Sequence, residues 1–151
     1  MADLDDIDRA ILRVLLNDGG LGPKAVGERV GLSQPAAWRR IERLERSGVI
    51  RGRRLRVDAA ALGYPVTVFL GVKLGTRGRV ALADFERAVL AIPEVQLVQH
   101  VLGVYDYRLK VIARDIADFE RVLRRRIMSL PGVGEVESNV MLSGRERPPP
   151  L

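Results

Sequence analysis

A short sequence repeat in the second half of the chain restricts its possible folds more than any other feature. Asp84-Phe85-Glu86-Arg87 recurs as Asp118-Phe119-Glu120-Arg121, and Ile92-Pro93-Glu94-Val95 recurs as Leu130-Pro131-Gly132-Val133. The offset between the copies grows from 34 to 38 residues, so the second copy gains about one helical turn. Each copy predicts the same unit, in which a helix is followed by a proline-containing corner and a strand.

Alternating apolar residues predict strands around both repeated helices. We expect helices over residues 82–92 and 116–127 and strands over residues 66–74, 95–102, 105–112 and 136–142. Two such units in series give βαββαβ, the ferredoxin-like arrangement of one antiparallel sheet with helices on one face. The other face also carries apolar surface, with Phe69 beside Gly71, so we expect it to pair with another subunit.

The first third of the chain has the apolar spacing of three short helices. The first ends at Asn17-Asp18-Gly19-Gly20, and the second runs from about Pro23, which is permitted in a first turn, to Gly31. The third begins after Ser33, a favourable N-cap, and ends at Ser47-Gly48. The complete chain is therefore predicted to be of the α+β class.

The connection between the second and third helices is only Gly31-Leu32-Ser33. Gly27 lies four residues before Gly31, where a side chain would obstruct the close approach of the two helices. This spacing indicates a helix-turn-helix, in which the second helix enters the major groove of DNA. Trp38 lies one position off the buried stripe, and we expect it to pack at the margin of the core rather than on DNA.

Positive charge is concentrated in the same region. The chain has a formal net charge of +6; residues 24–56, with ten basic and three acidic residues, carry +7, and the rest of the chain sums to −1. Such a block is typical of a polyanion contact, with a solvated cationic face as the alternative. The alternation of residues 49–57 predicts a wing strand beside the DNA backbone. We expect double-stranded DNA to be contacted by Ser33, Gln34, Pro35, Ala36, Arg39, Arg40, Arg43, Arg51, Arg53 and Arg54.

The domain organisation follows from these elements. We expect a winged helix-turn-helix domain at residues 1–57, a linker at 58–65, a ferredoxin-like domain at 66–144 and a mobile, proline-rich tail at 145–151. The chain lacks cysteine, which excludes thiolate zinc sites and disulfides. No leader and no apolar run of membrane-spanning length is present, so we expect a cytoplasmic protein with no membrane partner, metal or cofactor.

Several ordered motifs resemble the Lrp/AsnC family of bacterial and archaeal regulators, along nearly the whole chain. The matching stretches are Leu4–Leu12, Val30–Ser33, Arg40–Glu45, Gly48–Ile50, Gly103–Tyr107 and Leu130–Val133. The resemblance implies a transcriptional regulator with a winged helix-turn-helix and a ferredoxin-like effector domain, also called a RAM domain. It also implies homodimers formed through the sheet, often assembled into tetramers or octamers.

The same resemblance implies an effector, usually an amino acid held between dimers near the G-x-x-D-Y loop. Backbone amides would meet its carboxylate, and Asp106 would meet its amine. Two departures, Leu102 and Val136, stand where the family often has threonine, or serine in the first case, so the effector is expected to be apolar or absent. Carried over by position, the effector site comprises Gly103, Tyr105, Asp106, Tyr107 and Ser138.

An enzyme is the competing class of function. The architecture also resembles the sirohaem decarboxylases, which need histidine and arginine in the cleft, but His100 is the only histidine here. Residues 20–25 match the dinucleotide fingerprint G-x-G-x-x-A, yet a predicted helix rather than a strand precedes them. We therefore expect no catalytic residues. A metabolite-binding protein with a vestigial DNA module is a third alternative, against which the +7 segment argues.

Overall fold

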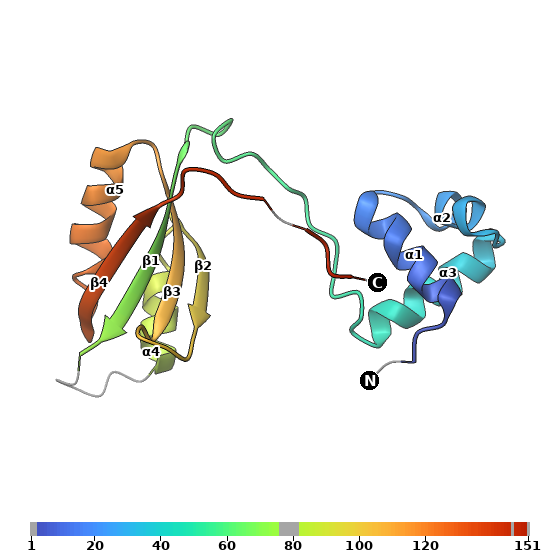
Figure 1. Cartoon of the computed structure of the whole chain (residues 1–151), viewed down its shortest axis with the longest axis horizontal. Coiled ribbons are helices and arrows are strands. Elements are labelled where there is room, and N and C mark those ends of the chain that lie inside the picture. Colours follow the sequence, from blue (N-terminus) through green and yellow to red (C-terminus); the bar gives the residue numbers. More distant parts are fainter. Residues whose placement is uncertain (1–2, 76–81, 146, 151) are drawn as a thin grey trace. The chain divides into compact units, whose positions relative to one another are not determined.

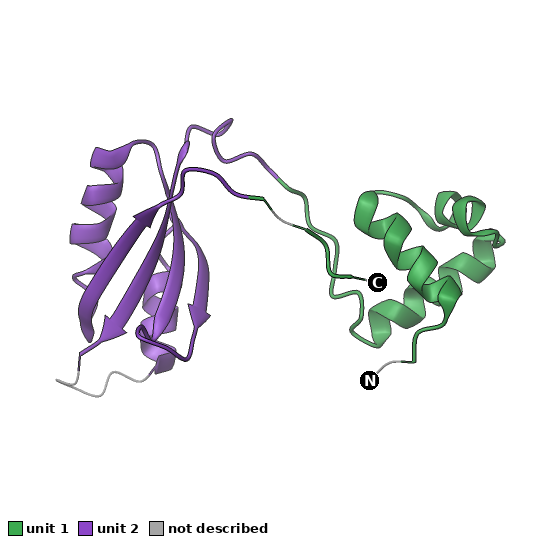
Figure 2. Cartoon of the chain, viewed as in Figure 1, with its two compact units in different colours: residues 1–56, 145–151 green, residues 57–144 purple. Residues whose placement is uncertain are grey.

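The computed structural model describes residues 3–75, 82–145 and 147–150 (Figure 1). The chain divides into two compact units, one of residues 1–56 with 145–151 and one of residues 57–144 (Figure 2). Each unit encloses its own hydrophobic core, as is usual for segments that fold as separate domains.

The first unit contains three consecutive helices, α1 (Asp6–Asn17), α2 (Pro23–Val30) and α3 (Gln34–Arg46), which confirms the predicted helices. Side chains cap two of them. The Asp8 N–H donates to Asp5 Oδ1 at 2.8 Å, and the Ala36 N–H donates to Ser33 Oγ at 3.4 Å. Such caps satisfy N–H groups that have no partner within the helix. The core between the helices consists of Ile11, Leu12, Val26, Ile41 and Leu44.

The turn between α2 and α3 depends on glycine, as expected from the sequence. The Leu32 N–H donates to the Gly27 carbonyl at 2.9 Å, and a Cβ at Gly27 would lie 2.6 Å from the Leu32 carbonyl oxygen. Gly31 ends α2 with a φ of 73°, a conformation that favours glycine. Trp38 is 52% exposed, so about half of its surface remains accessible to solvent beside the core.

The strand expected over residues 49–57 is absent. Residues 51–57 form no strand within the described part of the chain, and they are exposed to solvent. A single extended segment has no neighbouring strand to bind its backbone N–H and C=O groups, which therefore remain hydrated. Arg53 ties the segment to the first unit, because its Nη1 donates to the carbonyls of Gly19 at 3.2 Å and Leu21 at 3.0 Å.

The second unit confirms the predicted βαββαβ order. Its strands pair antiparallel in the order β2-β3-β1-β4, and both helical segments pack into one core with the sheet (Figure 1). The elements are β1 (Val66–Leu74), α4 (Leu82–Leu90), β2 (Val95–His100), β3 (Tyr107–Ala113), α5 (Ile116–Val122), the π-helix η1 (Leu123–Ile127) and β4 (Val133–Val140). The extra helical turn predicted for the second repeat is η1.

Five strand limits differ from the expectation. β2 ends at His100 rather than at residue 102, β3 ends at Ala113 rather than at 112, and β4 ends at Val140 rather than at 142. β3 begins at Tyr107 rather than at residue 105, and the preceding Asp106 N–H donates to the Val72 carbonyl of β1 at 3.0 Å. β4 begins at Val133 rather than at residue 136, because Leu74 and Lys73 of β1 pair with Val133 and Glu135.

The described helices of the second unit pack on only one of the two faces of the sheet. Val68, Leu70, Val72 and Leu109 face the helices in the core. The opposite face, called the open face below, carries the alternate residues of each strand. Phe69 and Ile112 of its centre are half-buried, although no element of the described chain is assigned to that side. No helix within the described ranges is long and apolar enough to cross a membrane.

Candidate DNA-binding and effector surfaces

The start of α3 presents polar and cationic side chains to solvent. Gln34, Pro35 and Arg39 are exposed, while Ala36 is half-buried and Ser33 forms the cap. Arg39 has no ion-pair or hydrogen-bond partner among the described residues. An exposed helix start with an unpaired guanidinium is suited to reading base edges or binding phosphates.

Arg40 and Arg43 are instead engaged within the unit. Arg40 Nη1 donates to Asp5 Oδ2 at 2.6 Å and to Asp8 Oδ1 at 2.9 Å, and Arg43 Nη2 donates to Asp8 Oδ2. The Asp8 side chain is 1% exposed, so these arginines neutralise a buried carboxylate. The hydrogen bond from Arg40 also lowers the pKa of Asp5. The two arginines thereby connect α3 to the start of α1.

Asp8 was missed in the sequence because it lies in a first helical turn, where carboxylates are ordinarily solvated. One signal was available. Asp5 and Asp8 have the spacing of a capping box, and each backbone N–H donates to the other residue's carboxylate. That spacing indicates an inward-turned acidic side chain.

The cationic segment after α3 divides into free and anchored residues. Arg51 and Arg54 are exposed and have no partner within the described part of the chain. Arg53 binds the two carbonyls of the α1–α2 connection and lies 4.0 Å from Glu45. The free arginines are therefore available to a polyanion, and Arg53 fixes where their segment leaves the helices.

The loop between β2 and β3 projects an apolar tip. Leu102 and Gly103 are exposed, and Val104 is 76% exposed. Asp106 closes the loop, since its Oδ2 accepts the Leu74 N–H at 2.8 Å and its carbonyl accepts the Val101 N–H at 3.0 Å. An exposed apolar tip on a firmly closed loop is suited to a partner molecule or ligand.

Tyr105 and Tyr107 lie on opposite sides of the sheet. The ring of Tyr105 covers Gly71 so closely that a Cβ there would lie 2.5 Å from its Cδ2. Its hydroxyl donates to Glu137, which raises the pKa of Tyr105 and lowers that of Glu137. Tyr107 is fully buried on the helix side, where its hydroxyl donates to Glu86 Oε1 at 2.9 Å. Burial and then Glu86 raise the pKa of Tyr107 to about 12.

The effector residues expected from the sequence therefore do not converge in one protomer. Ser138 pairs with Leu70 and so faces the helix side of β4, the side that also holds Tyr107. Tyr105 lies on the open face. Gly103 and Asp106 remain together in the loop, and Gly71 and Glu137 are additional residues of this region that the sequence did not indicate.

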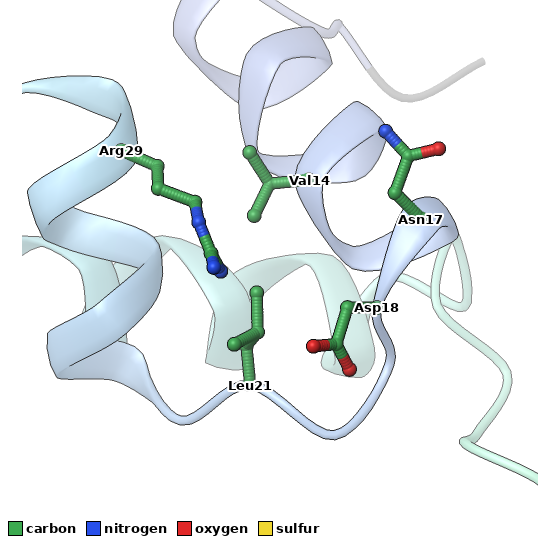
Figure 3. A pocket seen from close by; sticks show the side chains of 5 residues that line it. All are labelled: Val14, Asn17, Asp18, Leu21 and Arg29. Atoms are coloured by element: carbon green, nitrogen blue, oxygen red, sulfur yellow. The ribbon is translucent and has the colours of Figure 1, made fainter.

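An apolar hollow of about 240 Å³ lies beside the α1–α2 connection (Figure 3). Val14 projects into it from α1, and the Arg29 side chain extends toward Leu21 from α2 (Figure 3). The helix α1 precedes the G-x-G-x-x-A string, which confirms that the string is not a dinucleotide site. The hollow is smaller than usual small-molecule pockets, and we assign it no ligand.

A catalytic or metal site could be formed by histidine and acidic side chains. His100 stacks on Tyr107 with ring centroids 4.9 Å apart. Within the residues that the structure describes, no group of three or more histidine and acidic side chains could hold a metal ion.

A helix-turn-helix unit joined to a four-stranded sheet with helices on one face is the build of a transcriptional regulator that has separate DNA-binding and sensing units. Sequence profiles agree with this division. The winged helix-turn-helix DNA-binding profile matches residues 4–51, and the Lrp/AsnC ligand binding domain profile matches residues 67–150. The chain belongs to the Lrp/AsnC family and is a transcriptional regulator of that type.

Relatives and solved structures extend along the whole chain. The Bkd operon transcriptional regulator of Pseudomonas aeruginosa is 35% identical and covers 99% of both chains. An AsnC family transcriptional regulator from Agrobacterium tumefaciens is 32% identical with a TM-score of 0.85, covering 98% of this chain and 96% of its own. A Neisseria meningitidis transcriptional regulator in complex with L-Met is 28% identical with a TM-score of 0.88, covering 96% and 94%. All three are named as transcriptional regulators.

Proposed function

We propose that this regulator binds double-stranded DNA through the exposed start of α3 and the free arginines that follow it. Arg39 carries the proposal, because it is exposed on α3 and has no partner among the described residues. Arg51 and Arg54 add unpaired charge in the segment with a net charge of +7. Gln34 is positioned to read a base edge, and phosphate contacts by the arginines fix the register.

The other residues expected to contact DNA either shape the start of α3, hold it in position or contact DNA with part of their side chain. Ser33 is the N-cap of α3 and binds the Ala36 N–H, and Pro35, which has no N–H, lies in the first turn, so these three residues shape the helix start that faces DNA. Arg40 positions α3 through Asp5 and Asp8, and Arg53 positions the cationic segment. Arg43 is 56% exposed and binds Asp8 through Nη2, which leaves its other donors for DNA.

The DNA proposal is tested by titrating the protein onto the promoter of its own gene at several salt concentrations. Arg39→Ala should weaken binding about tenfold or more and lower the salt dependence by about one counterion. Arg46→Ala is the matched control, since Arg46 lies in the last turn of the same helix and pairs with Glu42 at 2.6 Å. Equal losses of DNA affinity in both variants would show that only the net charge matters, and would contradict the assignment of the start of α3 as the DNA-binding element.

We also propose that the open face forms a homodimer, from which tetramers or octamers assemble. Phe69 and Ile112 give this face an apolar centre. The open face carries cations on β3 (Arg108, Lys110) and anions on β4 (Glu135, Glu137). In a two-fold dimer, the cations of one copy can therefore face the anions of the other. Phe69→Glu should lower the mass measured by light scattering to that of one chain. Leu90→Glu, on exposed α4, should leave the mass unchanged.

For sensing, we propose an apolar amino acid as the effector, bound at the loop of residues 101–106. The exposed Leu102 and Val104 suit an apolar side chain, and Asp106 has one carboxylate oxygen without a recorded partner in the described structure. The relative from Neisseria meningitidis, in complex with L-Met, supports this ligand class.

Calorimetry with L-methionine, L-leucine and L-aspartate tests the effector. The two apolar ligands should bind and L-aspartate should not. Leu102→Ser, which removes an exposed side chain, should weaken binding about fivefold without loss of stability. Binding that is unchanged in Leu102→Ser and Asp106→Ala would exclude the loop.

A further inference from the structure

A second hollow, of about 360 Å³, lies in the second unit away from the 101–106 loop. It is formed by the end of β3, the corner before β2 and one side of α5 and η1. We call it the basic hollow, and its charged lining is Glu94, Arg114, Asp118, Arg121, Arg125 and Arg126. Four arginines against two carboxylates leave a net charge of +2 in one concave site.

The carboxylates of the basic hollow are already neutralised by specific partners. Arg126 Nη1 donates to Glu94 Oε2 at 2.9 Å, and Arg121 Nη2 donates to Asp118 Oδ1. Asp118 also accepts the Arg114 N–H at 3.0 Å, and this bond is the main cause of the lowered pKa of Asp118. The acidic groups therefore hold two arginines in place rather than cancel the whole charge.

Arg114 and Arg125 supply the charge that remains. The Arg114 guanidinium stands 5.9 Å from the centroid of the Tyr64 ring, which restricts its movement. Arg125 has no side-chain partner within the described part of the chain. Two guanidinium groups, one of them supported by an aromatic ring, can bind two edges of a tetrahedral anion.

Two of the arginines that line the hollow lie in the π turn η1. The Met128 N–H donates to the Leu123 carbonyl at 2.8 Å, the five-residue spacing of a π-helix. Arg125 and Arg126 both line the hollow beside Arg121. Arg124 does not line it and pairs with Glu120 at 2.9 Å. Single π turns are frequent at functional sites, because they change the direction of side chains in an otherwise regular helix.

We propose that the basic hollow binds a small anion carrying a phosphate group, as a ligand site separate from the 101–106 loop. The volume lies in the range of small-molecule sites, and the charge of +2 matches a phosphate dianion. A DNA backbone fits less well. An extended polyanion is best met by an open row of cations, whereas Glu94 and Asp118 stand in the wall of this concave site.

Calorimetry on the full chain tests the proposal, with inorganic phosphate as the probe and sodium chloride of equal ionic strength as the reference. The parent protein should bind phosphate, and Arg125→Ala should weaken binding about tenfold through loss of a charged hydrogen bond. Arg124→Ala removes the same charge from the adjacent position and should change binding less than about twofold. Glu94→Gln should tighten binding, because it removes a competing carboxylate and releases Arg126.

Three results would overturn the proposal. They are the absence of phosphate binding to the parent, equal weakening by Arg124→Ala and Arg125→Ala, and a selective loss of promoter affinity in Arg125→Ala. The last would identify DNA as the occupant. Arg39→Ala should bind phosphate like the parent, so failure of the DNA-binding proposal and failure of this one are distinguishable.

Discussion

Asp8 is a carboxylate in a position where an isolated charge would be costly. It is fully buried, and its oxygens accept from Arg40, Arg43 and the Asp5 N–H. A buried charge with several charged hydrogen bonds is tolerated, whereas removal of one member leaves the others without partners. At the residue scale, Asp8 is therefore a polar tie between α1 and α3 that adds to their shared apolar core.

We predict that Asp8→Ala lowers the free energy of unfolding of the first unit by about 2 kcal/mol, since it removes two ion pairs and half of the capping box. Urea denaturation followed by the fluorescence of Trp38, the only tryptophan, measures this unit directly. Glu42→Ala removes an exposed partner of Arg46 and should cost less than about 0.5 kcal/mol. Equal losses in the two variants would contradict a special role for Asp8.

Tyr107 makes the second unit sensitive to alkali. Its pKa is raised from 10.0 to about 12, so the folded state favours the neutral phenol. The free energy of unfolding is then unaffected below pH 10 and falls as the pH rises toward about 12, by about 3 kcal/mol in total. In Tyr107→Phe this decline should be shallower, and the highest step of the phenolate absorbance titration should disappear. Loss of a step near pH 10 instead of the highest step would contradict the burial of the hydroxyl.

At the scale of elements, the sequence predicts what local periodicity determines and misses what depends on distant partners. The three N-terminal helices and the βαββαβ order follow from apolar spacing and the repeat. Residues 49–57 have the alternation of a strand, but a strand also needs a neighbour, which no local pattern reveals. The π turn of η1 changes one hydrogen-bond spacing and leaves no periodic signal beyond the longer second repeat.

The contact between α2 and α3 gives an element-scale prediction. Gly27→Ala gains helix propensity, about 1 kcal/mol, but places a Cβ 2.6 Å from the Leu32 carbonyl oxygen. The backbone of the turn must move, so we expect a net loss of about 1–2 kcal/mol in the free energy of unfolding. Gly19→Ala is the control, because its Cβ meets only an ordinary contact of 3.6 Å, and it should be near neutral. A stabilised Gly27→Ala would show that the turn can relax.

At the scale of the whole molecule, some features of the candidate sites could be predicted from the sequence, and others depend on contacts between distant residues. The sequence indicated the arginine-rich region, because charge is visible without a fold. It did not separate the free Arg39 from Arg40, since the partner of Arg40 lies on another helix. The two faces of a sheet likewise separate Tyr105 from Tyr107, although the chain places them two residues apart.

Among the segments between the two cores that the structure describes, residues 51–57 should be an early site of trypsin cleavage. Residues 51–57 are exposed and lie outside any helix or strand, and Arg51 and Arg54 have no partner among the described residues. Exposed backbone of this kind fits a protease readily, whereas each unit has its own core. Mass spectrometry should therefore detect early cuts after Arg51 or Arg54 and a resistant C-terminal fragment that retains the sheet.

Promoter DNA should slow these cuts in the parent protein if the same arginines bind its backbone. It should not slow them in Arg39→Ala at concentrations where that variant leaves the DNA. Rapid loss of the C-terminal fragment would contradict the independence of the second unit, because a sheet that needs the N-terminal helices would unfold once the connection is cut. Equal protection of both variants would instead show that Arg51 and Arg54 hold DNA without α3, and the start of that helix would lose its place as the reading element.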